Sequence, residues 1–139
     1  SSIELQIWKI WMEHHNPKVK SLILLGIVEM NNQQYGKALE HFRMLTAIEP
    51  DFAEGWNKRA TVFYLMGRFN ESQEDILRTL KLEPRHFGAL SGLGLIRMES
   101  EDWPGAISAL EAALKVHPQM SGVIRNLKYV LKKLNESTT

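Results

Sequence analysis

The chain has 139 residues, 44% of them hydrophobic and 24% charged, which is ordinary for one folded domain or a short repeat array. Its 17 basic and 16 acidic residues leave a formal net charge of +1, which excludes a general affinity for nucleic acid or for acidic membranes. The absence of cysteine excludes disulfides, thiolate metal sites and cysteine nucleophiles.

The first predicted element is a helix over residues 3–15, inside an N-terminal region that we place at 1–18. Apolar residues cover most of its circumference, and they include Trp8, Trp11 and Met12. Such a helix is expected to be buried on more than one side. We predict that one side packs on the segment that follows, and that the other meets an upstream helix, a partner or a second copy. Because the chain begins at Ser1 rather than at methionine, we also expect a processed form or a piece of a longer protein.

The next region repeats with a period of 34 residues. Pro50, Pro84 and Pro118 are spaced by that period, and each ends a similar phrase: AIEP, KLEP and KVHP. The period divides the chain into three units, 19–52, 53–86 and 87–120. Apolar residues recur three and four apart in two stretches of each unit, which predicts two helices joined by a polar turn. Each proline ends a second helix, because proline cannot continue it.

Two positions of the unit carry small side chains, which predicts a close approach of its two helices. They are position 8 (Gly26, Ala60 and Gly94) and position 20 (Ala38, Ser72 and Ala106). The N-terminal helix follows the same period, since Trp8 and Trp11 fall at positions 24 and 27 of a preceding unit. It is therefore predicted to be the second half of an incomplete repeat or a cap on the array.

The phrase WNKRATVFYLMGRFNESQEDILRTLKLEP resembles the tetratricopeptide repeat family, whose pattern is W-x2-L-G-x2-Y, then A-x3-F, then P. This resemblance implies an all-α fold, a right-handed α-solenoid of helix-turn-helix repeats. Charged residues depart from the pattern at position 7 (Arg59) and position 11 (Glu29 and Arg97). We expect them to pair or snorkel at the edge of the core, rather than to form a functional buried ion pair.

The phrases EGWNKRA and PRHFGALSGLG are also similar to small, unassigned tetratricopeptide proteins of bacteria and chloroplasts. This second resemblance implies a soluble protein of the cytoplasm or the chloroplast. No apolar run approaches the ~20 residues that span a bilayer, so we expect no membrane insertion.

The last element is a helix predicted over residues 121–134, in a C-terminal region, 121–139, that caps the array. Ile124, Leu127 and Leu131 continue the apolar stripe, but position 8 is now Lys128. A second helix cannot pack closely on a lysine. One apolar face and one wet face are what a capping helix requires, and we expect the tail NESTT to fray.

In the tetratricopeptide family the first helices of the repeats line a concave groove that holds a segment of a partner. Carried onto this sequence, that arrangement predicts ten groove residues: Asn57, Thr61, Tyr64, Gly88, Ser91, Gly92, Leu95, Arg125, Tyr129 and Lys132. One subclass of the family grips chaperone tails with a lysine and an asparagine at positions 5 and 9 of its first unit. Those positions are Ile23 and Ile27 here, so we expect no binding of that kind.

Two interpretations remain open for Gly88 and Gly92, which lie four apart on one helical face beside the groove. They leave a hollow for a partner's side chain or backbone, or they let neighbouring helices approach closely. Gly94 has a packing role alone, because it occupies the small position of the unit.

These patterns predict a protein–protein interaction module or scaffold. Basic side chains at the capping helix make an acidic partner one expectation. The alternative is a self-associating scaffold, a homodimer formed through the helix that carries Trp8, Trp11 and Met12. The five histidines lack the spacing of metal ligands, and no phosphate loop or acid–base pair is present, so we expect no metal, no cofactor and no enzymatic activity.

Overall fold

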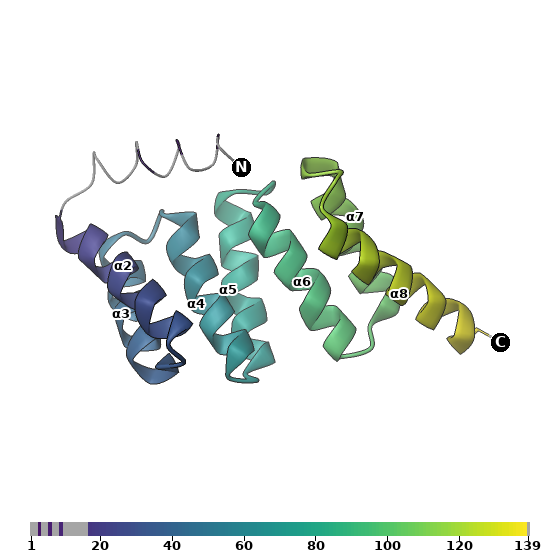
Figure 1. Cartoon of the computed structure of the whole chain (residues 1–139), viewed down its shortest axis with the longest axis horizontal. Helices are drawn as coiled ribbons and strands as arrows, with labels where there is room; N and C mark the ends of the chain where they lie inside the picture. Colours follow the sequence, from purple (N-terminus) through teal and green to yellow (C-terminus); the bar gives the residue numbers. More distant parts are fainter. Residues whose placement is uncertain (1–2, 4–5, 7–8, 10–16, 139) are drawn as a thin grey trace.

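The structure is a computed structural model, and it describes Ile3, Gln6, Lys9 and residues 17–138. Over residues 17–138 it contains seven α-helices and no strand, and these helices follow one another along the long axis of the molecule (Figure 1). The helices are α2 (Pro17–Asn31), α3 (Tyr35–Ile48), α4 (Ala53–Leu65), α5 (Phe69–Leu82), α6 (Phe87–Glu99), α7 (Trp103–Val116) and α8 (Ser121–Ser137). Each helix packs chiefly on its neighbours in sequence, most closely within the pairs α2–α3, α4–α5 and α6–α7. The architecture is an all-α solenoid, as predicted.

Proline ends each second helix in the same way. The last residues before the prolines, Glu49, Glu83 and His117, have left the helical conformation, with φ of −125°, −136° and −130°. Steric conflict with the proline ring disfavours the helical conformation at the preceding residue. The three second helices therefore end at the same position of the repeat.

The turn inside each repeat uses one residue with a left-handed backbone. These residues are Gln33, Gly67 and Glu101, with φ of 62°, 76° and 58°. In each turn the amide of the following residue donates to a carbonyl five residues back, as from Arg68 to Phe63 at 2.8 Å. This is the Schellman motif, which satisfies carbonyls that a helix end leaves unpaired.

Small residues allow the two helices of a repeat to approach closely, as predicted. A Cβ atom added to Gly26 would lie 2.3 Å from Cε1 of Phe42, and one added to Gly94 would lie 2.5 Å from Cδ2 of Leu110. Between α4 and α5, the hydroxyl of Ser72 donates to the carbonyl of Ala60 at 2.7 Å.

The contact between successive repeats buries positions 3 and 10, which the sequence analysis did not single out. Val62 packs in the core of the first repeat, and Ala89 and Ile96 of α6 share a core with Ile76 of α5. The largest consequence is in the capping helix, where Val123 and Val130 are the buried residues.

Two predictions for the capping helix are therefore wrong. Leu131, placed on its packing stripe, is 47% exposed, because the helix turns positions 3 and 10 toward α7. The helix also continues to Ser137, three residues beyond the predicted end, so that part of the tail is helical rather than frayed.

Candidate peptide-binding groove

An open cleft of about 870 Å³ lies where the first turns of α4 and α6 meet the links that join the repeats. Val116 and His117, at the end of α7, also line it. The polar side chains of its lining include Glu54, Asn57, Lys58, Arg85 and His86, and Gly88 lies beside them. Of the ten predicted groove residues, Asn57 and Gly88 line this cleft, and the other eight do not.

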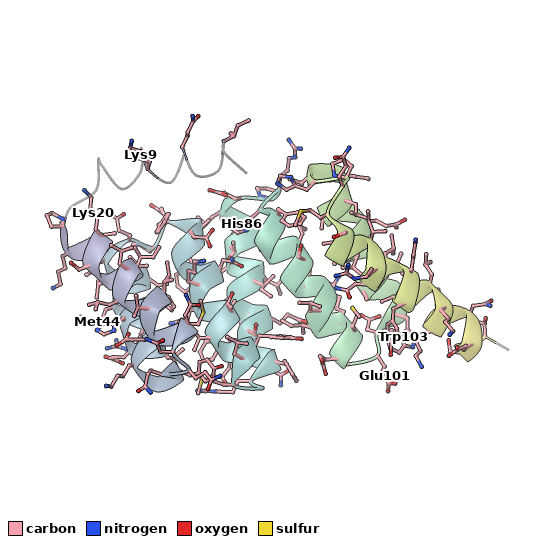
Figure 2. The ribbon with its side chains drawn as sticks, viewed as in Figure 1. Lys9, Lys20, Met44, His86, Glu101 and Trp103 are labelled. Atoms are coloured by element: carbon pink, nitrogen blue, oxygen red, sulfur yellow. The ribbon has the colours of Figure 1, made fainter. Side chains whose placement is uncertain are left out.

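A carboxylate and an imidazole join α4 to α6 at the wall of the cleft. His86, which lies at the N-terminal end of α6 (Figure 2), has its Nε2 2.7 Å from Oε2 of Glu54. Its Nδ1 accepts the backbone N–H of Ala89 at 3.0 Å and so caps α6. Because Nδ1 accepts, Nε2 carries the proton and donates to Glu54. The other carboxylate oxygen of Glu54 accepts from Asn57 at 3.2 Å and lies 3.6 Å from Nζ of Lys58.

The surroundings of this pair shift both of its acid–base equilibria. Burial by itself raises the pKa of Glu54, but the hydrogen bond from His86 and the charge of Lys58 outweigh it and lower the pKa. Burial by itself lowers the pKa of His86, but the carboxylate of Glu54, helped by Glu83, brings that pKa above its ordinary value. The pair therefore favours the ionised carboxylate and the protonated imidazole.

The sequence analysis considered the histidines only as metal ligands and gave His86 no role of its own. It missed the contact of His86 with Glu54. The two residues stand at positions 34 and 2 of the same unit, 53–86, and most of α4 and all of α5 lie between them in the sequence. The sequence feature that could have indicated this contact is a glutamate, Glu54, just after one link between repeats and a histidine, His86, in the next link.

The predicted groove residues of α4 are Asn57, Thr61 and Tyr64, and all three are half-buried. The hydroxyl of Thr61 donates to the carbonyl of Asn57 at 3.0 Å. The ring centroid of Tyr64 lies 5.3 Å from that of Phe69. Burial raises the pKa of Tyr64, and the negative charge of Glu99 on α6 adds to the effect. These side chains are therefore held in place by their own helix pair.

On α6 the two glycines differ. A Cβ atom on Gly92 would lie 3.2 Å from Cδ1 of Ile76, so a side chain of α5 fills the space beside this glycine, which favours the second of the two interpretations. Gly88 is exposed, and a Cβ atom there would lie 3.2 Å from Nδ2 of Asn57. Close packing thus accounts for Gly92, whereas Gly88 borders the cleft.

The remaining predicted residues of α6 are Ser91 and Leu95, both half-buried. The hydroxyl oxygen of Ser91 is itself buried and has no hydrogen-bond partner within the part of the chain that the structure describes. Ser91 lies three residues after Gly88, which puts the two on the same side of the helix.

The predicted residues of α8, Arg125, Tyr129 and Lys132, are exposed. Tyr129 packs its ring against Trp103 with 6.3 Å between centroids, and the ammonium of Lys133 lies 5.6 Å from the Tyr129 ring. Lys128 is also exposed, so α8 presents basic side chains to solvent, but none of them lines the cleft.

Two of the three charged residues on the packing stripe, Arg59 and Glu29, pair with a side chain of the second helix, as predicted. Arg59 makes two bonds to the carboxylate of Asp75, Nε to Oδ2 at 2.7 Å and Nη2 to Oδ1 at 2.9 Å. Glu29 pairs with His41, with 2.5 Å between Oε1 and Nδ1. His41 and Asp75 occupy the same position of their units, position 23. Arg97 donates instead to the carbonyl of Gly105 at 3.1 Å.

Trp8, Trp11 and Met12, the predicted association surface, lie outside the described residues. Among Ile3, Gln6, Lys9 and residues 17–138, no three acidic or histidine side chains gather closely enough to hold a metal ion. Within that same part of the chain, no helix combines the length and the apolar character needed to cross a membrane.

Comparison with known proteins gives the family. The tetratricopeptide repeat model matches residues 57–121. Over all 139 residues the chain is 31% identical to a TPR repeat-containing protein of Rhizobium etli, of which it covers 68%. It is also 24% identical, over 87% of its length, to the heat-shock protein cognate co-chaperone sgt12 of Aspergillus fumigatus, of which it covers 36%.

Solved structures share the fold. The Sgt2 TPR domain of Aspergillus fumigatus superposes with a TM-score of 0.83 at 24% identity, covering 88% of this chain and 83% of that one. The first TPR domain of Spaghetti (RPAP3), solved with the HSP90 peptide SRMEEVD, superposes with a TM-score of 0.83 at 17% identity, covering 87% of this chain and 96% of that one. Repeat period, helix packing and these matches agree: the chain belongs to the tetratricopeptide repeat family.

Proposed function

We propose that this chain is a non-enzymatic protein–protein interaction module that holds a segment of a partner along the first helices of its repeats. The observation that carries the proposal is the open cleft beside α4 and α6. Its wall has fixed polar groups, Glu54, Asn57 and His86, and an exposed glycine, Gly88, where a partner's backbone can come close.

The exposed basic side chains of α8, Arg125 and Lys132 among them, favour an acidic segment at that end. A structural neighbour, Spaghetti, binds the peptide SRMEEVD, which has more acidic than basic side chains.

The proposal is tested by capturing partners with the full chain and measuring their binding to paired variants. Gly88→Gln places a side chain in the cleft, whereas Gly36→Gln adds the same group to α3 where no atom lies within 4 Å. We expect Gly88→Gln to lose binding and Gly36→Gln to keep it. Equal binding by both variants would contradict a site in the cleft.

The acidic character of the partner is tested in the same assay. Arg125→Glu with Lys132→Glu reverses two charges on α8, and Lys37→Glu with Lys115→Glu makes the same change on the second helices. We expect the first pair to weaken binding and to flatten its dependence on salt, because charge attraction is screened by salt. Equal effects of the two pairs of substitutions would contradict a preference for an acidic partner, and they would not contradict binding in the cleft.

A self-associating scaffold is the alternative function, with contacts through the helix that carries Trp8 and Trp11. Leu24, Leu25 and Val28 of α2 are exposed, and in this alternative a second copy of the chain covers them. Sedimentation velocity at several concentrations decides it, since a homodimer sediments faster as the concentration rises.

A further inference from the structure

The first helix of the array exposes three apolar side chains side by side. Leu24, Leu25 and Val28 of α2 are 52%, 48% and 56% exposed. The spacings of three and four residues make them neighbours on one side of the helix. Within the described part of the chain, no side chain buries them.

The same face is buried in the later repeats. Leu25 and Val28 stand at positions 7 and 10 of the unit, where α6 has Leu93 and Ile96, both buried. Those two residues share a core with Ile76, which belongs to the second helix of the preceding repeat. Position 10 is also fully buried in α4 and α8. The face of α2 that carries Leu25 and Val28 therefore has the apolar residues with which a later first helix packs on the second helix of the preceding repeat.

The upstream sequence contains a segment with the matching period. The second helices begin at Tyr35, Phe69 and Trp103, each 34 residues after the last, and the same step backward gives residues 1–14. Trp8 then takes position 24, which Phe42 and Ile76 fill in the later repeats, both of them buried. Pro17, the first residue of α2, disfavours a helix that runs straight on into α2.

We propose that residues 1–14 form a half repeat that packs on Leu24, Leu25 and Val28 of the same chain. Two contacts between successive repeats later in the chain give the register of this segment against α2. Ile76 lies against Gly92, and Leu45 lies 3.5 Å from where a Cβ atom of Gly55 would be. The equivalent pairs put Trp8 against Leu24 and Trp11 beside Ser21. The tryptophans then cap the N-terminal end of the core within one chain, and they are not available to join two copies.

Thiol reactivity tests this proposal cleanly, because the chain has no cysteine of its own. The probe is Leu25→Cys, and the control is Leu77→Cys on α5, since Leu77 is 49% exposed and matches the 48% of Leu25. Reaction of the full chain with a disulfide reagent is timed in buffer, and each rate is divided by the rate of the same variant in urea. We expect Leu25→Cys to react about tenfold or more slowly than Leu77→Cys, because a packed thiol reacts only when the segment opens.

Further variants separate the possible covers of this face. Adding Trp8→Ser and Trp11→Ser to Leu25→Cys is expected to restore the rate of Leu77→Cys. Equal rates in the two single variants would overturn the proposal, because the face would then be bare. Protection that grows with protein concentration would assign the face to a second copy. Protection that survives the loss of both tryptophans would assign it to another segment or partner.

Discussion

Three residues, one in each repeat, hold the left-handed backbone that ends the first helix. In the second repeat this residue is Gly67, which has no Cβ atom to clash, but Gln33 and Glu101 occupy the same conformation. A residue with a side chain is less stable there by about 1–2 kcal/mol. The Schellman bonds of all three turns have similar lengths, as in the bond of 2.9 Å from Asp102 to Arg97. Glu101, the left-handed residue of that turn, is labelled in Figure 2. The motif is thus set by the helix end and the turn, and glycine only makes it easier.

Two glycine-to-alanine substitutions should therefore change stability in opposite directions. Gly67→Ala adds a methyl group in open space but at φ of 76°, so we expect a loss of about 1 kcal/mol in the free energy of unfolding. Gly36→Ala adds the same group inside α3, also in open space, and should gain up to about 1 kcal/mol from helix propensity. Urea unfolding of both variants measures the difference. A loss in both would mean that the added methyl group, and not the backbone angle, decides the outcome.

At the scale of the helix pair, a residue at position 7 or 11 of the first helix faces the residue at position 23 of the second helix in each repeat. The second repeat has Arg59 with Asp75, where the third has Leu93 with Ala109. The guanidinium of Arg59 also lies 5.1 Å from the ring of Trp56 and 5.7 Å from that of Phe63. An ion pair with aromatic neighbours thus takes the place of two apolar side chains in the same fold.

This exchange predicts a strong coupling between the two positions. Arg59→Leu leaves the buried carboxylate of Asp75 without its partner, and we expect it to lower the free energy of unfolding by about 2–3 kcal/mol, since Arg59 is partly exposed. Adding Asp75→Ala recreates the pair of the third repeat and should return stability to within about 1 kcal/mol of the original chain. A double-mutant cycle in urea measures the coupling. Additive losses would show that the two repeats do not tolerate each other's residues.

The second helices could be predicted closely from sequence, because period and proline act locally. Pro50, Pro84 and Pro118 end them whatever lies around them. The face of α8 could not be predicted as well. Val123 and Val130 of α8 share a core with Leu90 of α6 and with residues of α7, whereas Leu131 of the predicted stripe is 47% exposed, so the buried side of α8 is centred on positions 3 and 10.

At the scale of the whole molecule, the candidate site depends on how successive repeats are set against each other. The sequence places Asn57 and Gly88 on the right helices, but the cleft beside them forms where two links and three helices meet. The filling of the space at Gly92 by Ile76 depends on the same geometry. A repeat period gives the order of helices and leaves the rotation from one unit to the next open. That rotation brings Glu54 and His86 together.

In a solenoid each repeat contacts only its neighbours, so one bridge between repeats affects the stability of the array. The Glu54–His86 bond joins α4 to α6, with Lys58 beside the carboxylate and Glu83 acting on the imidazole. His86 has a raised pKa, so its contribution is present below its unfolded pKa of about 6.5 and is lost as the pH rises through the higher folded pKa. Glu54 has a lowered pKa, so its contribution is present above its unfolded pKa of about 4.3 and is lost as the pH falls through the lower folded pKa.

The pair should therefore stabilise the array most between about pH 4.3 and pH 6.5, and less above that window. Protonation of Nδ1 also removes the cap bond from Ala89, which offsets part of the gain. His86→Asn keeps a capping oxygen but cannot titrate, so its free energy of unfolding should fall less between pH 6 and pH 8 than that of the original chain. Glu54→Gln should flatten the same profile, because it removes the charge that raises the pKa of His86. Urea unfolding across this range measures both, and an unchanged slope in the two variants would show that the bridge does not couple the repeats to pH.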